Sequence, residues 1–571
     1  MEPIAGLAIV AVLLIVAVSA FAEKHGVAAP LLLVVVGIGL SVIPGAPALE
    51  IEPEWILTVV LPPLLYAAAV NMPATDFRRD FGAIGALSVL LVIASAFASG
   101  AVLYWLLPDL GFAAAVAVGA VISPPDAVAA TAIGKRLGLP SRLVTILEGE
   151  GLVNDATALV LMRTAVAATA GAVSFGSALG DFAIAVVVGA GVGLIVGIVT
   201  VQIRARIDQP VLTTAISFVV PFLAFVPAEE LHASGVLAVV VAGLVTGAQS
   251  ARKFSPGDRI VDRTNWRTIQ MLLENGVFLL MGYQMTVLIE DVRHDGFGVW
   301  LAVGLGLVAT AVLVLARVVF VIPLVAWLRR GERRNAEKAE RIEDALGRID
   351  AVNFSHAPER RERVTRFLQR KQADAAFYAR EGLGWRGGAV LAWSGMRGVV
   401  TLAAAQSLPS DLPYRSQLIL VAFTVAVVTL LVQGGTLPAV IRMLGVRGSD
   451  AQEAHREFTR LVAELGDAAR ALLDNPGLRR SDGKPFDAAI VDEVRRRSLA
   501  AAPPSGDHEE WTGALPRLEQ RRELQRMVLD AEQAALLDAR ASGIYHSHAI
   551  IAAQHAIDNN FAMLEGPSAH G

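Results

Sequence analysis

The chain has 571 residues, of which 54% are hydrophobic and 18% are charged, and its formal net charge is -4. This composition is typical of a protein that crosses the membrane many times, and the slightly negative charge argues against a nucleic-acid partner. The chain contains no cysteine, which excludes disulfides, a thiol nucleophile and cysteine metal sites.

Apolar segments of spanning length recur along the chain, separated by short polar breaks. We expect them to be helices, because lipid leaves the backbone polar groups of other open structures without partners. The expected fold class is therefore an all-α polytopic membrane protein. About thirteen spans are predicted, at residues 3–21, 27–43, 55–70, 81–107, 111–133, 143–170, 182–202, 211–226, 233–246, 266–289, 296–328, 387–408 and 417–444.

Positive charge is concentrated in every second break between these spans. The basic breaks contain Lys24; Arg78 and Arg79; Lys135, Arg136 and Arg142; Arg204 and Arg206; and Arg252, Lys253, Arg259, Arg263 and Arg267. The intervening breaks are acidic or neutral. The positive-inside rule then places the N-terminus outside the plasma membrane and the C-terminus in the cytoplasm.

Two polar segments interrupt or follow the spans. Residues 329–385 are dense in Arg, Glu and Lys with a helical composition, and they are expected to form a cytoplasmic insert within a membrane domain of residues 1–447. Residues 448–571 form a polar tail with amphipathic runs. We expect its helices to pack on each other or on a second subunit in the cytoplasm.

The sixth predicted span carries polar residues inside an apolar run. A charge in the bilayer interior costs several kcal/mol unless it is paired or hydrated, so such residues are functional candidates. Asn154 and Asp155 form the centre of the stretch. Helical spacing places Glu150 on one stripe with Asn154, and Gly151 on the neighbouring stripe with Asp155.

The fifth predicted span contains Ser123-Pro124-Pro125-Asp126. Two consecutive prolines remove two backbone donors and clash with the preceding turn, so the helix is expected to break here. The break frees carbonyl groups near the membrane midplane, which is how transporters build ion sites from discontinuous helices.

The twelfth predicted span contains Arg397 between two nearby glycines, Gly395 and Gly398. A buried guanidinium requires a carboxylate or freed carbonyls, and Glu150 is the expected partner. Further charges inside the spans are expected to be structural and to neutralise one another. They are Arg163, Glu274 and Arg317.

These motifs together resemble those of the monovalent cation/proton antiporters of the NhaP and eukaryotic sodium–proton exchanger kind. The resemblance covers roughly residues 3–444 and leaves the tail outside. It rests on LPPLLYAAAVNMP (61–73), ISPPDAVAATAIGKRLGLP (122–140), EGEGLVNDATALVL (148–161), ENGVFLLMG (274–282) and WSGMRGVVTLA (393–403). The ND pair, PDAVA and the GxRG segment are specific in combination.

The resemblance implies inverted repeats with crossed discontinuous helices, and a core domain that moves against a dimerisation domain in a homodimer. It implies a transporter rather than an enzyme, with no cofactor. Asp155 would bind a cation or a proton alternately, and Asp126 would help to hold the cation. Glu150 would pair with Arg397. Relatives with Asn before the Asp exchange one cation for one proton, with Na⁺ as the expected cation and K⁺ as the alternative.

The cation/proton-binding set expected from the motifs is Asp155, Asp126, Asn154, Pro125 and Ser123, with the transported metal ion held by Asp155 and Asp126. Side-chain oxygens are fewer than in many relatives, because Gly151 replaces a Ser, Pro125 a Thr, and Ala67 an acid. The sequence disfavours two other classes of protein. An intramembrane aspartyl protease would carry GxGD where this chain has GLVND, and a channel would carry a filter loop, of which the sequence shows no sign.

Overall fold

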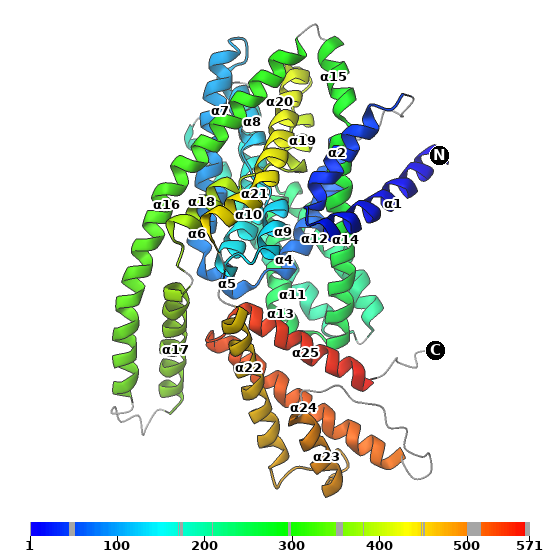
Figure 1. Ribbon diagram of the computed structural model, residues 1–571, viewed down its shortest axis with the longest axis vertical. Helices are drawn as coiled ribbons and strands as arrows, with labels where there is room; N and C mark the ends of the chain where they lie inside the picture. The colour runs from blue at the N-terminus through cyan, green and yellow to red at the C-terminus, as the bar shows by residue number, and fades with distance from the viewer. Residues whose placement is uncertain are drawn as a thin grey trace.

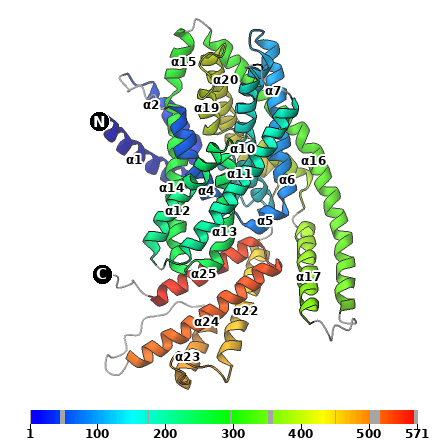
Figure 2. The same cartoon turned by 180° about the vertical axis from the view of Figure 1, so that it is seen from behind.

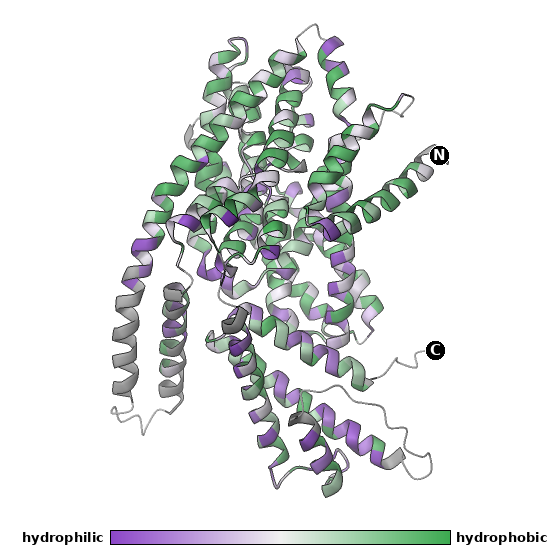
Figure 3. Cartoon of the chain, in the orientation of Figure 1, coloured by the Kyte–Doolittle hydropathy of each residue, from purple (hydrophilic) through white to green (hydrophobic). Residues whose placement is uncertain are grey.

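The computed structural model describes residues 2–44, 52–169, 171, 175–207, 209–294, 298–349, 358–380, 382–446, 448, 451–499 and 515–565. Over these ranges the regular secondary structure is entirely helical, as the composition predicts. The apolar helices form one bundle, and the polar helices of the tail lie together at one end of it (Figure 1). Figure 3 shows the same division in hydropathy.

The bundle is built from helices of very different length. Those of its first half are α1 (Glu2–His25), α2 (Ala29–Ser41), α3 (Pro53–Trp55), α4 (Leu61–Asn71), α5 (Ala74–Arg79), α6 (Phe81–Gly85), α7 (Val92–Leu106), α8 (Phe112–Ile122), α9 (Val128–Arg136) and α10 (Ser141–Thr169). The second half contains α11 (Phe175–Arg204), α12 (Pro210–Glu230), α13 (Gly235–Lys253), α14 (Pro256–Tyr283), α15 (Met285–His294), α16 (Val299–Ile349), α18 (Trp385–Trp393), α19 (Val399–Gln406), α20 (Arg415–Val428) and α21 (Gly435–Leu444). The π-helical turns Ile56–Val60, Ala86–Leu91 and Thr429–Gly434 join α3 to α4, α6 to α7 and α20 to α21.

Within the described residues, 10 helical segments are long and apolar enough to cross a membrane, and α2 and α8 are shorter apolar helices. The multi-pass fold is therefore confirmed, and the count of about thirteen spans stays a prediction. The outer surface of the bundle is rich in exposed apolar side chains, such as Trp300 and Ile322. Such a surface suits lipid rather than water.

Helices α2 and α14 cross at very close range on one side of the bundle. An added Cβ at Gly37 in α2 would lie 2.3 Å from the carbonyl oxygen of Leu279, and one at Gly282 in α14 would lie 2.3 Å from that of Val34. The two backbones are therefore in direct contact, as small residues permit in membranes. α14 itself starts at a capping box made by Ser255 and Asp258.

The insert is an extension of the bundle rather than a separate loop. α16 has 51 residues and continues from the apolar span into polar sequence without interruption. The antiparallel helix α17 (Pro358–Arg380) packs beside this extension (Figure 2). The segment FSHAPE (354–359), which separates the two helices of the insert, lies largely outside the described residues, and α17 begins at its Pro358.

In its described residues the tail forms four helices, α22 (Ala451–Leu473), α23 (Ala488–Leu499), α24 (Leu515–Ser542) and α25 (Ser547–Glu565). They bury apolar cores of their own, one of them around Leu461, Leu536 and Ile557. α25 lies against the end of the bundle and α23 lies farthest from it (Figure 1).

Candidate functional site

The fifth span breaks where the two prolines predict. α8 ends at Ile122, α9 begins at Val128, and the residues between them are not helical. Neither proline carries a backbone N–H, so carbonyls at the end of α8 are left without helical donors. This region is buried in the middle of the bundle, where those carbonyls need other partners.

The twelfth span breaks in the same manner. α18 ends at Trp393 and α19 begins at Val399. The two breaks meet, because the backbone N–H of Asp126 donates to the carbonyl oxygen of Met396 at 2.6 Å. Gly398 is required at this crossing, since an added Cβ would lie 2.1 Å from Oδ2 of Asp126. The crossed discontinuous helices expected from the motifs are therefore present.

Asp126 lies between the starts of two half-helices. Its Oδ1 accepts a hydrogen bond from the backbone N–H of Val128 at 2.8 Å, at the first residue of α9. Its Oδ2 packs against Gly398, the residue preceding α19. Because helix N-termini carry partial positive charge, both half-helices stabilise this carboxylate.

Arg397 binds the carbonyls that the proline break frees. Its Nε donates to Ile122 at 3.1 Å and its Nη2 to Ser123 at 3.3 Å, and it also donates to Gly395. The backbone N–H of Arg397 donates to Oγ1 of Thr429. The guanidinium thus neutralises the negative end of α8.

The expected ion pair between Glu150 and Arg397 is wrong. Glu150 is paired with Arg317 of α16, through Nη1–Oε1 at 2.5 Å and Nη2–Oε2 at 2.8 Å. All three side chains are at most 2% exposed. Two arginines in the apolar spans could pair with this buried acid. Arg317 forms the bidentate pair with Glu150, and Arg397 instead binds the carbonyls that the proline break frees.

Arg317 also fastens α16 to the second break. Its Nε donates to the carbonyl oxygen of Leu391 in α18 at 3.0 Å. Gly395 makes room for its stem, because an added Cβ there would lie 2.6 Å from Cδ of Arg317. One guanidinium therefore holds α10, α16 and α18 together.

α10 packs directly on the first break. Nδ2 of Asn154 donates to the carbonyl oxygen of Pro125 at 2.5 Å, and Oδ1 of this fully buried amide has no partner within the described residues. Gly151 faces Ala127, and an added Cβ would lie 2.9 Å from the Ala127 Cβ. The small residue at 151 is therefore explained by helix packing.

Asp155 is the carboxylate at this crossing that remains without a partner. The part of the chain that the structure describes contains no hydrogen bond or ion pair to it. It lines a small cavity whose other walls are apolar and come from α8, the first break, α10 and α19. Those walls are Val121, Pro124, Ala158, Leu159, Met162, Val400 and Ala404.

Ser123 and Pro125 contribute backbone oxygens to the crossing. The hydroxyl of Ser123 donates to Ala120 at 3.0 Å, and its carbonyl accepts from Arg397. The carbonyl of Pro125 accepts from Asn154. Both residues hold the break in shape, and their role as cation ligands stays a prediction.

The three further charges do not neutralise one another, contrary to expectation. Arg163 is paired with Glu229 at 2.7 Å, and its side chain is 52% exposed, so it is not buried. Arg317 is ion-paired with Glu150. Among the residues that the structure describes, Glu274 accepts only a long contact of 3.5 Å, from Gln270 one turn earlier in α14. The span of Arg163 is apolar in sequence, but its side chain reaches the surface.

Two contacts at the site were not foreseen from the sequence. Thr429 lies in the thirteenth predicted span and accepts from the Arg397 backbone. Ser88 donates to the carbonyl of Glu150 at 3.2 Å. Neither residue belongs to a charged motif, and a hydroxyl in an apolar span most often bonds its own helix, so the sequence carries no signal for these contacts.

An apolar helix bundle with two crossed breaks and a free carboxylate beside them is typical of a secondary ion transporter. Comparison with known proteins agrees. The family described as "Sodium/hydrogen exchanger, transmembrane" matches residues 9–443, and the chain belongs to this family.

Individual relatives cover most of the chain. An uncharacterized Na⁺/H⁺ exchanger of Mycobacterium tuberculosis is 31% identical over 468 residues, which is 80% of this chain and 78% of the relative. The Na⁺/H⁺ antiporter ApNhaP of Aphanothece halophytica is 28% identical, over 77% of this chain and 74% of the relative. In fold, the chain is similar to the sodium proton antiporter MjNhaP1 of Methanocaldococcus jannaschii, with a TM-score of 0.55, 17% identity, and coverage of 78% of this chain and 100% of that one.

Proposed function

We propose that the protein exchanges Na⁺ for H⁺ across the plasma membrane, with Asp155 binding the cation and the proton alternately. One observation carries the proposal. Glu150 and Asp126 are both held by donors from the protein, whereas Asp155 is left free beside a cavity between the half-helices. A carboxylate that only binds the fold together would not remain unpaired at this depth.

Competition at one carboxylate is sufficient for exchange. A proton and a small cation cannot both occupy Asp155, and an empty negative charge crosses a low-dielectric barrier only at high cost. Only the loaded states of the core then move between the two sides. Each cation carried one way returns one proton, which makes the cycle electroneutral.

The oxygens available near Asp155 suit a hard monovalent cation. The orphan Oδ1 of Asn154 is the first candidate ligand after the Asp155 carboxylate. Asp126, Ser123 and Pro125 are further candidates. Because no additional hydroxyl stands at position 151, water completes the shell in this proposal.

The larger arrangement follows from the same proposal. Residues 1–447 carry the exchange, the N-terminus lies outside and the C-terminus lies in the cytoplasm. The protein works as a homodimer, and the tail of residues 448–571 regulates the membrane domain or supports the dimer. The docking of α25 on the bundle through the Arg259–Asp558 ion pair supports a regulatory tail.

The test is proton movement in proteoliposomes after addition of Na⁺, K⁺, Li⁺ or Rb⁺. The wild-type protein is expected to release a stored proton gradient on addition of Na⁺. Asp155→Asn is expected to abolish this signal while expression and folding are retained, because an amide cannot cycle a proton. Asp181→Asn is a matched control, since this acid is exposed on α11.

Sodium-driven proton movement in purified, folded Asp155→Asn would overturn the role of Asp155. A signal with K⁺ and none with Na⁺ would favour the potassium alternative. Current that needs no counter-ion and follows voltage would indicate a channel.

A further inference from the structure

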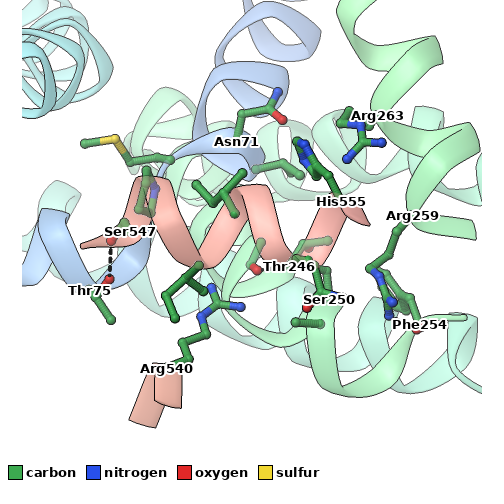
Figure 4. A pocket seen from close by; sticks show the side chains of 18 of the residues that line it. Asn71, Thr75, Thr246, Ser250, Phe254, Arg259, Arg263, Arg540, Ser547 and His555 are labelled. Atoms are coloured by element: carbon green, nitrogen blue, oxygen red, sulfur yellow. Dashed lines mark hydrogen bonds between the residues drawn. The ribbon is translucent and has the colours of Figure 1, made fainter. Parts of the chain in front are cut away.

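A cavity of about 180 Å³ lies where the tail meets the membrane domain (Figure 4). The ends of α4, α11 and α13, the start of α14 and the short helix α5 line it from the bundle, and α24 and α25 line it from the tail. This space is far larger than one water molecule needs. It is separate from the crossed helices, and none of the residues at Asp155 belongs to it.

Its walls carry more positive than negative charge. Five arginines line the cavity against two aspartates. The arginines are Arg79, Arg204, Arg259, Arg263 and Arg540, and the aspartates are Asp262 and Asp558. A cavity of this kind favours an anion.

Three of the arginines are already neutralised. Arg259 is paired with Asp558, and Arg204 with Asp262. Arg79 is paired with Asp374 of α17 at 2.7 Å. These pairs use both aspartates of the cavity wall, which leaves two of its arginines without an ion pair.

The remaining two arginines have no ion pair or hydrogen bond within the described residues. They are Arg263 of α14 and Arg540 of α24. Burial and the neighbouring Arg252 lower the pKa of Arg540, although Asp76 opposes them. Burial and Arg263 likewise lower the pKa of His555 on α25. Burial and nearby arginines thus both disfavour the charged forms of these groups, and a buried unpaired guanidinium is costly.

Neutral hydroxyls complete the surroundings. Those of Thr246 and Ser250 on α13 donate to carbonyls of their own helix, and that of Ser547 on α25 is hydrogen-bonded to Thr75 (Figure 4). Arginine binds phosphate oxygens in a bidentate manner, so the guanidinium groups are the donors that this cavity offers to a phosphate.

We propose that this cavity is a binding site for a phosphate-bearing anion, held between Arg263 of the membrane domain and Arg540 of the tail. The phosphate belongs either to a soluble metabolite or to the headgroup of an anionic lipid in the cytoplasmic leaflet. Because the two arginines come from opposite sides of the interface, the anion would tie the tail to the bundle. Ligand that binds only the docked tail stabilises that arrangement by mass action.

The test is thermal unfolding of the full-length protein with defined probes. In detergent, inorganic phosphate and AMP are titrated at constant ionic strength against chloride. In nanodiscs, phosphatidylglycerol is compared with phosphatidylcholine. We expect at least one phosphate-bearing probe to raise the melting temperature. A response to the soluble probes identifies a metabolite site, and a response to phosphatidylglycerol alone identifies a lipid site.

Variants that remove one positive charge test whether the rise in melting temperature comes from binding in this cavity. Arg263→Gln and Arg540→Gln are each expected to raise the half-saturating probe concentration about tenfold or more, the loss of one charge-assisted contact. Arg522→Gln is the control, since this arginine is exposed on α24 and does not line the cavity. Its response should match that of the wild type.

Two results would overturn the site. One is a response of Arg263→Gln and Arg540→Gln equal to that of Arg522→Gln. The other is a wild-type melting temperature that does not distinguish phosphate from chloride, nor phosphatidylglycerol from phosphatidylcholine. The second result needs only the wild-type protein, so it decides the matter even where a variant fails to fold.

Discussion

Arg317 of α16 donates two parallel hydrogen bonds to the carboxylate of Glu150 in α10, across 167 positions of the chain. The pair is almost fully buried. It joins the helix that carries Asp155 to the long helix that leaves the membrane. Asp155 is thus held in position by a neighbouring ion pair that does not itself contact the cavity.

Breaking this pair from one side is expected to destabilise the fold. Glu150→Gln leaves Arg317 as an uncompensated buried charge, at a cost of roughly 3–5 kcal/mol. The double variant Glu150→Gln/Arg317→Met should recover a large part of the loss, because no buried charge remains. Unfolding of both single variants and the double variant measures the coupling. Strictly additive effects would show that the two side chains do not act as a pair.

Arg397 is expected to behave differently, because it holds carbonyls rather than an acid. Arg397→Met should cost about 1.5–3 kcal/mol for the lost charged hydrogen bonds. It should also impair exchange, since the end of α8 loses its partner. The stability and the transport rate of Arg397→Lys should lie between those of the wild type and of Arg397→Met, because an ammonium reaches fewer carbonyls. Melting temperature and transport rate are measured together, and a larger coupling of Glu150 to Arg397 than to Arg317 would contradict this assignment.

Gly151→Ser separates packing from ion coordination. The added Cβ would lie 2.9 Å from the Ala127 Cβ, so we expect lower stability by about 1–3 kcal/mol and a lower rate, with unchanged preference between Na⁺ and K⁺. The second-site variant Ala127→Gly should restore both properties by removing the clash. A tighter apparent affinity for Na⁺ in Gly151→Ser, without loss of stability, would instead show that the hydroxyl coordinates the ion.

The tail is expected to loosen as pH rises. Burial raises the pKa of Glu532 on α24 to about 7. The folded tail therefore binds this proton more tightly than the unfolded chain. The resulting stability is fully present below the usual range of a glutamic acid and is lost as pH rises through about 7. Glu532→Gln should remove this dependence and leave the tail more protected than the wild type at alkaline pH.

Hydrogen exchange of α24 at about pH 5.5 and about pH 8.5, corrected for the intrinsic rate, measures this effect. Glu519→Gln is the matched control, because this residue is exposed on the same helix. Equal pH dependence in Glu532→Gln and the wild type would exclude Glu532 as the titrating group.

The sequence alone predicted the features that depend on local chemistry. Two adjacent prolines cannot continue a helix, so the break after Ile122 could be placed to within a few residues. The amphipathic run in the tail likewise became α22. Such rules act within one or two turns, where neighbours along the chain are also neighbours in space.

Partner choice between distant helices could not be predicted in the same way. Arg317 and Arg397 are both arginines in apolar spans, and helical spacing does not relate either of them to Glu150. Their partners are decided by where backbones approach each other, as at Gly395, which makes room for Arg317. The exposure of Arg163 was missed for a similar reason, because apolar sequence does not tell which side of a helix meets the surface.

α16 remains helical through its internal Pro323, so the apolar span and its polar extension are joined in one helix that can act as a lever. The stretch from Arg317 to Ile349 extends ~48 Å at the helical rise of ~1.5 Å per residue. A tilt of about 5° at the Arg317 fulcrum would sweep the far end sideways by ~4 Å, as rigid-rod geometry at that rise requires. A small rotation of α16 at its contact with Glu150 thus becomes a displacement at the far end of the helix that is comparable to the width of a side chain. The same helix works in reverse, so a force applied to its polar arm would reach the helix that carries Asp155 with a smaller displacement and a larger force.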